Sequence, residues 1–249
     1  MGSVARLYRH PVKGLGEEAL AEAALVPGRA MPFDRHWAIA PAGSDWDPET
    51  GGWVEPRHFV TQTFVPGLAR ATVAWDEGAR RLVLSHPERG EIALDPDAEE
   101  GQAMLADWIG PLAELRRPGP YRIARLDTGG FTDDPDAHVS INSLSSLAAL
   151  EQAAGAELAH IRFRGNIWLD GLAPWEEFDL VGREIALGPV RLKVTERIER
   201  CNATTASPVS GERDVPVPDI LQRQWGHRDF GVYAEVIEGG TVRLGDRLA

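Results

Sequence analysis

Short apolar segments separated by turn-forming residues occupy the first hundred positions, and they limit the fold of this chain more than any other feature. Segments with strand character recur at residues 4–8, 36–40, 71–75, 81–84 and 91–94. Gly, Pro and Asp separate these segments, and short strands at such close spacing are typical of a barrel or a sandwich. We therefore expect the first half of the chain to be rich in β-structure.

Helical spacing of apolar residues interrupts this strand pattern. Residues 99–109 are expected to form a helix that ends at Pro111. Residues 143–154 are expected to form another helix, with Asn142 or Ser143 as its N-cap.

The second half adds further strands, expected at residues 161–169, 184–187 and 190–198. Residues 219–224 are expected to contribute one or two helical turns. The last segment is expected to form a hairpin in which residues 230–237 and 241–244 pair around a Gly-Gly turn. These elements predict an α+β fold that is mainly β.

Length and composition suit two domains. The chain has 249 residues, of which 43% are hydrophobic, and this is enough to build a real core. Three prolines follow the expected helix at residues 99–109. We place the domain boundary after them, which gives domains at residues 1–126 and 127–249.

The net charge argues against two classes of partner. Lys and Arg number 26 and Asp and Glu number 38, giving −12 at neutral pH, and Lys13 and Lys193 are the only lysines. So acidic a chain is a poor candidate for non-specific binding to nucleic acid or to an anionic membrane. No apolar run approaches the roughly 20 residues of a membrane helix, and the N-terminus lacks a signal-peptide pattern. We therefore expect a cytoplasmic protein with no nucleic-acid or membrane partner.

Cys201 is the only cysteine. A single thiol excludes an internal disulfide, a four-cysteine zinc site and an iron–sulfur cluster held by this chain alone. Arg200 precedes it, and a neighbouring cation favours the thiolate, which is both a nucleophile and a ligand for soft metals. The alternative is an inert core cysteine.

Residues 161–169 alternate polar and apolar side chains. In a strand, this alternation places Arg162, Arg164 and Asn166 on one face. Two guanidinium groups and an amide offer hydrogen-bond donors to an anion such as a phosphate. The alternative, which the pattern alone favours, is a solvated outer face.

Two further segments have open roles. Residues 41–56 are rich in Gly, Pro and Asp and form an expected long loop that carries Trp46 and Trp53. This loop either lines the mouth of a site or is a mobile hairpin tip. Residues 133–138 are similar to a metal-binding loop, but a polar turn is the favoured interpretation.

Several motifs together resemble one family. The opening His10-Pro-Val-Lys-Gly segment and Phe33-Asp-Arg-His-Trp resemble the β-barrel domain that precedes MOSC domains. Phe163-Arg-Gly-Asn-Ile and Arg200-Cys-x-x-Thr-Thr-x-x-Pro-x-x-Gly resemble the MOSC domain itself. The resemblance spans nearly the whole chain. It implies an N-terminal β-barrel domain followed by a MOSC-type β-barrel domain with peripheral helices.

MOSC proteins hold a molybdenum cofactor, a pyranopterin ending in a phosphate, through a cysteine bound to molybdenum. The resemblance therefore implies molybdopterin with molybdenum as the cofactor, and Cys201 as the metal ligand and catalytic residue. It also implies that the pterin and its phosphate are bound by Lys13, Arg35, Ser143, Arg164, Asn166 and Arg200. Because Lys13 and Arg35 belong to the first domain, the site is expected in an interdomain cleft.

The chain departs from the family at two places. Relatives often carry a serine after the opening lysine, where this chain has Gly14, and one cofactor contact is therefore absent. Relatives often carry Thr-Gln-Arg in the barrel domain, where this chain has Thr61, Gln62 and Thr63. That arginine is a candidate to face the substrate, so its absence bears on the substrate class.

The family includes the C-terminal domain of molybdenum cofactor sulfurases, amidoxime reducing components and bacterial reductases of N-hydroxylated bases. The resemblance thus implies an oxidoreductase that reduces N-oxygenated small molecules. The chain has no room for a pyridoxal-phosphate domain, and one cysteine cannot hold an iron–sulfur cluster. Electrons are therefore expected from a separate flavoprotein, ferredoxin or cytochrome.

Two alternatives to this function stay open. One is a non-catalytic carrier of the cofactor or a sulfur-transfer module. The other ignores the resemblance and is a thiol hydrolase or transferase, with Cys201 as the nucleophile and His227 as the base.

Overall fold

The computed structural model describes residues 2–126, 129–133 and 135–249. Within these ranges the α-helices are α1 (Glu99–Ala113), α2 (Leu144–Ala154) and α3 (Val217–Trp225). The strands are β1 (Ser3–Arg9), β2 (Glu18–Leu20), β3 (Glu22–Leu25), β4 (Trp37–Ala40), β5 (Thr72–Asp76), β6 (Arg81–His86), β7 (Gly90–Leu94), β8 (Arg122–Arg125), β9 (Val139–Ser143), β10 (Ile167–Asp170), β11 (Glu184–Leu187), β12 (Val190–Glu199), β13 (Asp229–Glu238) and β14 (Gly240–Arg243).

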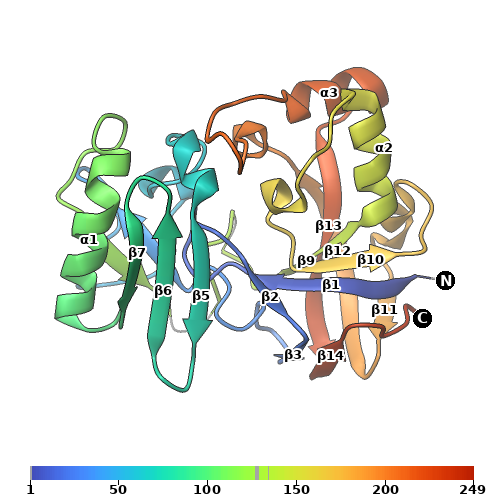
Figure 1. Cartoon of the computed structure of the whole chain (residues 1–249). Coiled ribbons are helices and arrows are strands. Elements are labelled where there is room, and N and C mark those ends of the chain that lie inside the picture. Colours follow the sequence, from blue (N-terminus) through green and yellow to red (C-terminus); the bar gives the residue numbers. More distant parts are fainter. Residues whose placement is uncertain (1, 127–128, 134) are drawn as a thin grey trace.

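The larger lobe contains both ends of the chain. Its seven-stranded sheet follows the order β11-β12-β13-β9-β10-β1-β2, and β3 pairs with β14. Figure 1 shows the two termini together in this right-hand lobe. Residues 3–25 lie before the predicted domain boundary at residue 126, yet β1 and β3 pair with strands that follow it.

The smaller lobe is built from the rest of the first half. It carries the antiparallel sheet β5-β6-β7 and the pair β4-β8, with α1 beside them on the left of Figure 1. Each lobe buries its own apolar core, one around Val4 and Val232 and the other around Trp37 and Trp108. The predicted α+β class, mainly β, is confirmed.

Four segments of the chain cross between the two cores. They run from Leu7 to Val12, from Leu15 to Ala23, from Met31 to Trp37 and from Ile123 to Val139. The first and third crossings are hydrogen-bonded to each other, since Lys13 N donates to Trp37 O over 2.8 Å and Arg35 N donates to His10 O over 2.7 Å. Lys13 and Arg35 therefore meet where the two lobes join.

Helix α1 is longer than predicted, and the expectation that Pro111 ends it is wrong. The helix continues through Pro111 to Ala113. Proline lacks the N–H that would bond the carbonyl four residues earlier, which belongs to Asp107. Arg89 supplies a replacement donor, because its Nη2 donates to Asp107 O at 3.2 Å, and its Nε also donates to the next carbonyl, Trp108 O, at 3.0 Å.

Two predicted strand arrangements are also wrong. Residues 161–169 do not form one strand, because a 3-10 turn at His160–Phe163 leads into Arg164 with φ of 50°, and β10 begins only at Ile167. Arg162 and Arg164 therefore do not share a strand face. The expected C-terminal hairpin is replaced by pairing between β14 and β3, which brings the end of the chain against its beginning.

The prediction of a helix at residues 143–154 is confirmed by α2. Side chains in the first turn of this helix are hydrogen-bonded to buried groups. Ser143 is the N-cap and accepts a hydrogen bond from Ser146 N at 3.4 Å. The Ser146 hydroxyl donates to Glu177 Oε2 at 2.7 Å, and Oε1 of the fully buried Glu177 has no partner among the described residues. Burial raises the pKa of the Glu177 carboxyl to about 7.

Replacement Glu177→Gln is expected to stabilise the protein at alkaline pH. Between pH 4.5, the usual value, and pH 7, the folded state holds a proton that the unfolded state releases. Stability therefore falls as the pH rises through this window. Glutamine keeps the Ser146 hydrogen bond and cannot ionise, so the gain should reach about 3 kcal/mol at pH 8 and vanish near pH 4.5.

Urea unfolding at the two pH values measures this difference. Asp179→Asn removes an exposed carboxylate from the same turn and is the matched control. Equal stabilisation by Glu177→Gln at both pH values would contradict the explanation by a buried charge.

Candidate functional site

A cavity of about 610 Å³ lies where the crossing segments meet, and both halves of the chain line it. Its lining includes six of the seven predicted site residues, namely Lys13, Arg35, Arg164, Asn166, Arg200 and Cys201. Ser143 is outside the lining and fully buried, where it caps α2. Although the whole chain carries −12, seven cationic side chains and only two carboxylates are found among the described residues of the lining.

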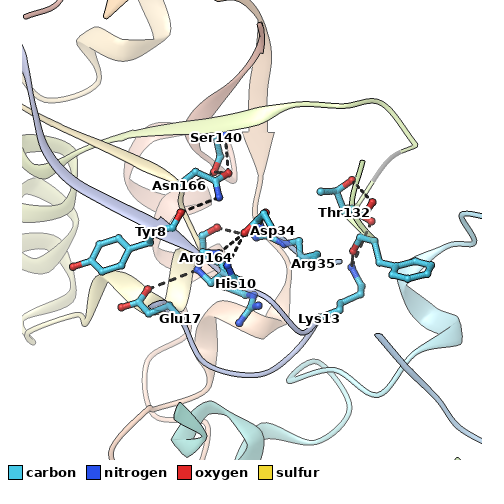
Figure 2. Close-up of polar contacts among 12 residues, drawn as sticks. Tyr8, His10, Lys13, Glu17, Asp34, Arg35, Thr132, Ser140, Arg164 and Asn166 are labelled. Atoms are coloured by element: carbon cyan, nitrogen blue, oxygen red, sulfur yellow. Dashed lines mark hydrogen bonds and ion pairs between the residues drawn. The ribbon is translucent and has the colours of Figure 1, made fainter. Parts of the chain in front are cut away.

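Lys13, directly after the first crossing segment, binds the fourth one. Its ammonium group donates to Phe131 O at 2.6 Å, to Thr132 O at 3.4 Å and to Asp133 Oδ1 at 3.4 Å. Figure 2 shows Lys13 reaching toward the segment of Thr132. Burial lowers the pKa of this amine to about 8, although the charge of Asp133 acts in the opposite direction. All three N–H donors of the ammonium group therefore have acceptors within one short segment.

Arg35 has a left-handed backbone, with φ of 51°, and is paired with its neighbour Asp34. The Asp34 carboxylate also accepts hydrogen bonds from His10 N at 2.7 Å and from His10 Nδ1 at 3.0 Å. Burial alone would lower the pKa of the Arg35 guanidinium, but the charges of Asp34, Tyr233 and Asp133 together outweigh it and raise the pKa above its usual value. Asp34 is therefore the fixed counter-ion of Arg35.

Arg164 reaches from the second half to the first. Its Nη1 donates to Leu15 O and its Nη2 to Val12 O at 3.5 Å, while its own carbonyl accepts from Arg35 Nη2 at 2.8 Å. Burial, with the nearby charge of Arg35, lowers the pKa of the Arg164 guanidinium to about 9. Figure 2 shows Arg164, Arg35 and Asp34 meeting at this junction.

Arg200 connects three segments of the second half. Its Nε donates to Phe230 O at 2.8 Å, its Nη1 to Phe163 O at 2.8 Å and its Nη2 to Asn142 Oδ1 at 3.0 Å. Burial lowers the pKa of its guanidinium to about 10. Because Arg200 directly precedes Cys201, these bonds also fix the backbone that carries the thiol.

Asn166 lines the cavity, but its amide is engaged with neighbouring strands. Its Oδ1 accepts from Ser140 N at 3.1 Å and from Ser140 Oγ at 2.9 Å, and its Nδ2 donates to Tyr8 O at 3.3 Å. These contacts join β9 to β1 (Figure 2). The side chain therefore positions the wall of the cavity.

Cys201 is exposed, which contradicts the interpretation as an inert core cysteine. Its Sγ lies 3.8 Å from Thr63 Oγ1, on a segment of the first half. Arg213 holds the two segments together, since its Nη1 donates to Asn202 O and its Nη2 to Thr63 O, both at 2.6 Å. An arginine outside the predicted set thus brings Thr63 to the thiol.

Positive charge exceeds negative charge within this cavity. The four cations described above have two hydrogen-bonded carboxylate partners among the described residues, Asp34 and Asp133. Burial lowers the pKa of three of the four, as expected for cations removed from water without full compensation. The arrangement therefore favours an anionic ligand.

Gly14, one of the departures noted above, has a packing explanation. Its φ is 81°, and a Cβ atom at this position would lie 2.7 Å from Val60 O and 2.9 Å from Thr61 Cα. A serine here would push the first crossing away from the segment that leads to Thr63.

Three residues of the site were missed from the sequence. Asn142 is fully buried and accepts from Arg200, and Cβ atoms at Gly165 and Gly231 would lie 1.9 and 2.3 Å from its amide atoms. Only glycine leaves room for the Asn142 amide at these two positions, so the two glycines are the signal in the sequence that could have revealed Asn142. Asp34 and Asp133 act through partners that sequence spacing does not reveal, since Lys13 and Asp133 are 120 positions apart.

The long loop at residues 41–56 supports the site from outside. Neither tryptophan lines the cavity, and only Pro56 at the end of the loop reaches it. Trp46 is 6% exposed in a core cluster that includes Phe131, and Trp53 Nε1 donates to Thr132 O at 3.3 Å.

His227 is not placed as a base for Cys201. It is absent from the described lining of the cavity, its Nδ1 accepts from Asp229 N at 3.0 Å, and its ring packs against Trp175 and Phe178. The thiol hydrolase hypothesis therefore lacks its general base.

Residues 2–126, 129–133 and 135–249 contain no cluster of three or more His, Cys, Asp or Glu side chains that could hold a metal ion. They also contain no helix that is both long and apolar enough to cross a membrane.

Comparisons with known proteins agree on the family. The MOSC domain matches residues 128–249, and the MOSC N-terminal beta barrel domain matches residues 1–108. The predicted boundary at residue 126 lies between these matches and stays a prediction. A search of curated proteins finds no match.

Two solved structures are similar to the chain. The YUAD protein from Bacillus subtilis is 14% identical, with a TM-score of 0.47, over 100% of this chain and 94% of that chain. YiiM from Geobacillus stearothermophilus is 18% identical, with a TM-score of 0.35, over 45% of this chain and 52% of that chain. MOSC domains are associated with proteins of the molybdenum cofactor. Because the two family matches follow each other along both halves of the chain, it belongs to the MOSC-domain family, with a MOSC N-terminal β-barrel domain before the MOSC domain.

Proposed function

We propose that the cavity binds a molybdenum cofactor and that the protein is an oxidoreductase acting on N-oxygenated small molecules. One observation carries the proposal: the exposed thiol of Cys201 lines the same cavity as a group of cations that outnumber their carboxylate partners. A phosphate-bearing pterin with a thiolate-binding metal satisfies both features at once.

The residues present fit such a group. A phosphate needs fixed cationic donors, and Lys13, Arg35 and Arg164 are held by hydrogen bonds to the main chain and to Asp34. Molybdenum accepts a thiolate ligand, and Cys201 supplies one thiol at the end of β12. When bound, the cofactor supplies the two-electron redox chemistry, which this set of side chains lacks.

The protein's own residues orient the Cys201 thiol and position the side chains around it. Arg200 fixes the backbone before the thiol, and Arg213 holds Thr63 beside Sγ. Reduction of an N–OH group breaks the N–O bond, consumes two electrons and two protons, and releases water. We propose that a separate flavoprotein, ferredoxin or cytochrome delivers those electrons.

Replacement Cys201→Ala is expected to lower the molybdenum content to below about a tenth of the wild-type value, because a soft ligand is lost. Metal analysis of protein from a molybdenum-replete host measures this. Val209→Ala, at an exposed position of the following loop, is the control and should keep its molybdenum. Wild-type molybdenum and pterin in Cys201→Ala would contradict the ligand assignment.

Molybdenum-loaded protein should reduce an N-hydroxyamidine when a reduced viologen replaces the partner protein. The expected result is amidine formation that Cys201→Ala loses. Chromatography of the amidine product measures turnover. Bound cofactor without turnover, with any supplied reductant, would instead support a carrier or sulfur-transfer module.

An anion in the cavity should raise the pKa of Lys13. The amine has a pKa of about 8 without such a ligand, and a nearby negative charge raises it by roughly one unit or more. Reductive methylation followed by mass spectrometry gives the pH midpoint of labelling, and inorganic pyrophosphate should move that midpoint upward. The exposed Lys193, the only other lysine, is an internal control. An unchanged Lys13 midpoint would argue against an anion site here.

A further inference from the structure

The two carboxylates that serve the cations are held very differently. Asp34 is 1% exposed, and it is bound by the main chain and ring of His10 as well as by Arg35. Burial alone would raise the pKa of the Asp34 carboxyl, but the charge of Arg35 and the bonds from His10 hold it well below its usual range. Asp34 is therefore a permanent part of the site.

Asp133 is held much more loosely. Its side chain is 66% exposed, and it meets the Lys13 ammonium at 3.4 Å. Partial desolvation beside the cavity would raise the pKa of its carboxyl, but the charges of Lys13 and Arg35, and further that of Arg200, lower it. The carboxylate thus lies in the positive potential of the cavity while most of its surface faces solvent.

The backbone beside Asp133 is anchored independently of its carboxylate. Lys13 donates to the carbonyls of Phe131 and Thr132, and Trp53 Nε1 donates to Thr132 O. The Phe131 ring is fully buried against Phe59, with ring centroids 4.7 Å apart. A side-chain rotation can therefore move the carboxylate away from Lys13 without moving the segment.

We infer that Asp133 is an exchangeable counter-anion, which occupies the positive potential of the cavity without ligand and gives way to the anionic group of the ligand. The inference rests on the proposed function, because it requires that the ligand carry a phosphate-like group. Two negative charges a few ångströms apart repel strongly in a partly buried site. Asp133 therefore weakens binding of the anion and assists its release.

Isothermal titration calorimetry with inorganic pyrophosphate tests the inference on the full chain. Asp133→Asn keeps the shape of the side chain and removes its charge. The variant should bind pyrophosphate roughly five- to tenfold more tightly than the wild type. Asp136→Asn removes an equal charge from the same segment, outside the lining of the cavity, and should bind like the wild type.

Equal or weaker binding by Asp133→Asn would overturn the inference, and weaker binding would make Asp133 a direct ligand contact. If Asp133→Asn and Asp136→Asn both bind pyrophosphate more tightly by the same factor, the effect comes from the net charge of the protein. That result would also overturn the inference. The pH midpoint of Lys13 labelling shows which hypothesis has failed, the exchange inference or the proposed function.

If pyrophosphate neither binds the wild type nor shifts the Lys13 labelling midpoint, the phosphate site itself is wrong. If it does both and Asp133→Asn binds equally, only the exchange inference fails.

Discussion

Buried cations where the two lobes join are the constraint on which the site depends. A guanidinium or ammonium group removed from water destabilises the fold unless its N–H groups find acceptors. Here most of the acceptors are main-chain carbonyls: Arg164 donates to Leu15, Arg35 donates to Arg164, and Lys13 donates to Phe131. Each bond joins segments that are distant in sequence. The groups that create the positive potential therefore also hold the walls of the cavity together.

A carbonyl acceptor satisfies the hydrogen-bonding capacity of a cationic side chain but does not neutralise its positive charge. A carboxylate accepts the hydrogen bond and also neutralises the charge, as Asp34 does for Arg35. Arg200 shows the other case, since its described acceptors are two carbonyls and the amide of Asn142. Its charge is left for another partner. The cavity thus keeps a positive potential inside a chain whose net charge is −12.

The sequence motifs predicted correctly which residues gather around the cavity. The hydrophobic patterns were less successful in predicting the backbone structure that brings these residues together. The motifs identified Lys13, Arg35, Arg164 and Arg200, and the structure places all four around one cavity. The alternation at residues 161–169 misled the local prediction, because a turn followed by a left-handed residue produces the same order of polar and apolar letters. Periodicity describes neighbours along the chain. It contains no information on a contact such as Arg89 with Asp107, which lets α1 pass Pro111.

The crossing segments explain why residues from both halves of the chain line one cavity. Lys13 and Arg35 lie on segments of the first half, whereas Arg200 and Cys201 follow a strand of the second. One peptide bond joins Arg200 to Cys201, so the guanidinium bonds that brace the cationic wall also set where the thiol lies. A free inorganic anion can use the cations but has no use for the thiol. A ligand that carries both an anionic group and a thiol-binding atom can engage both, and we therefore expect the cavity to prefer it to simpler anions.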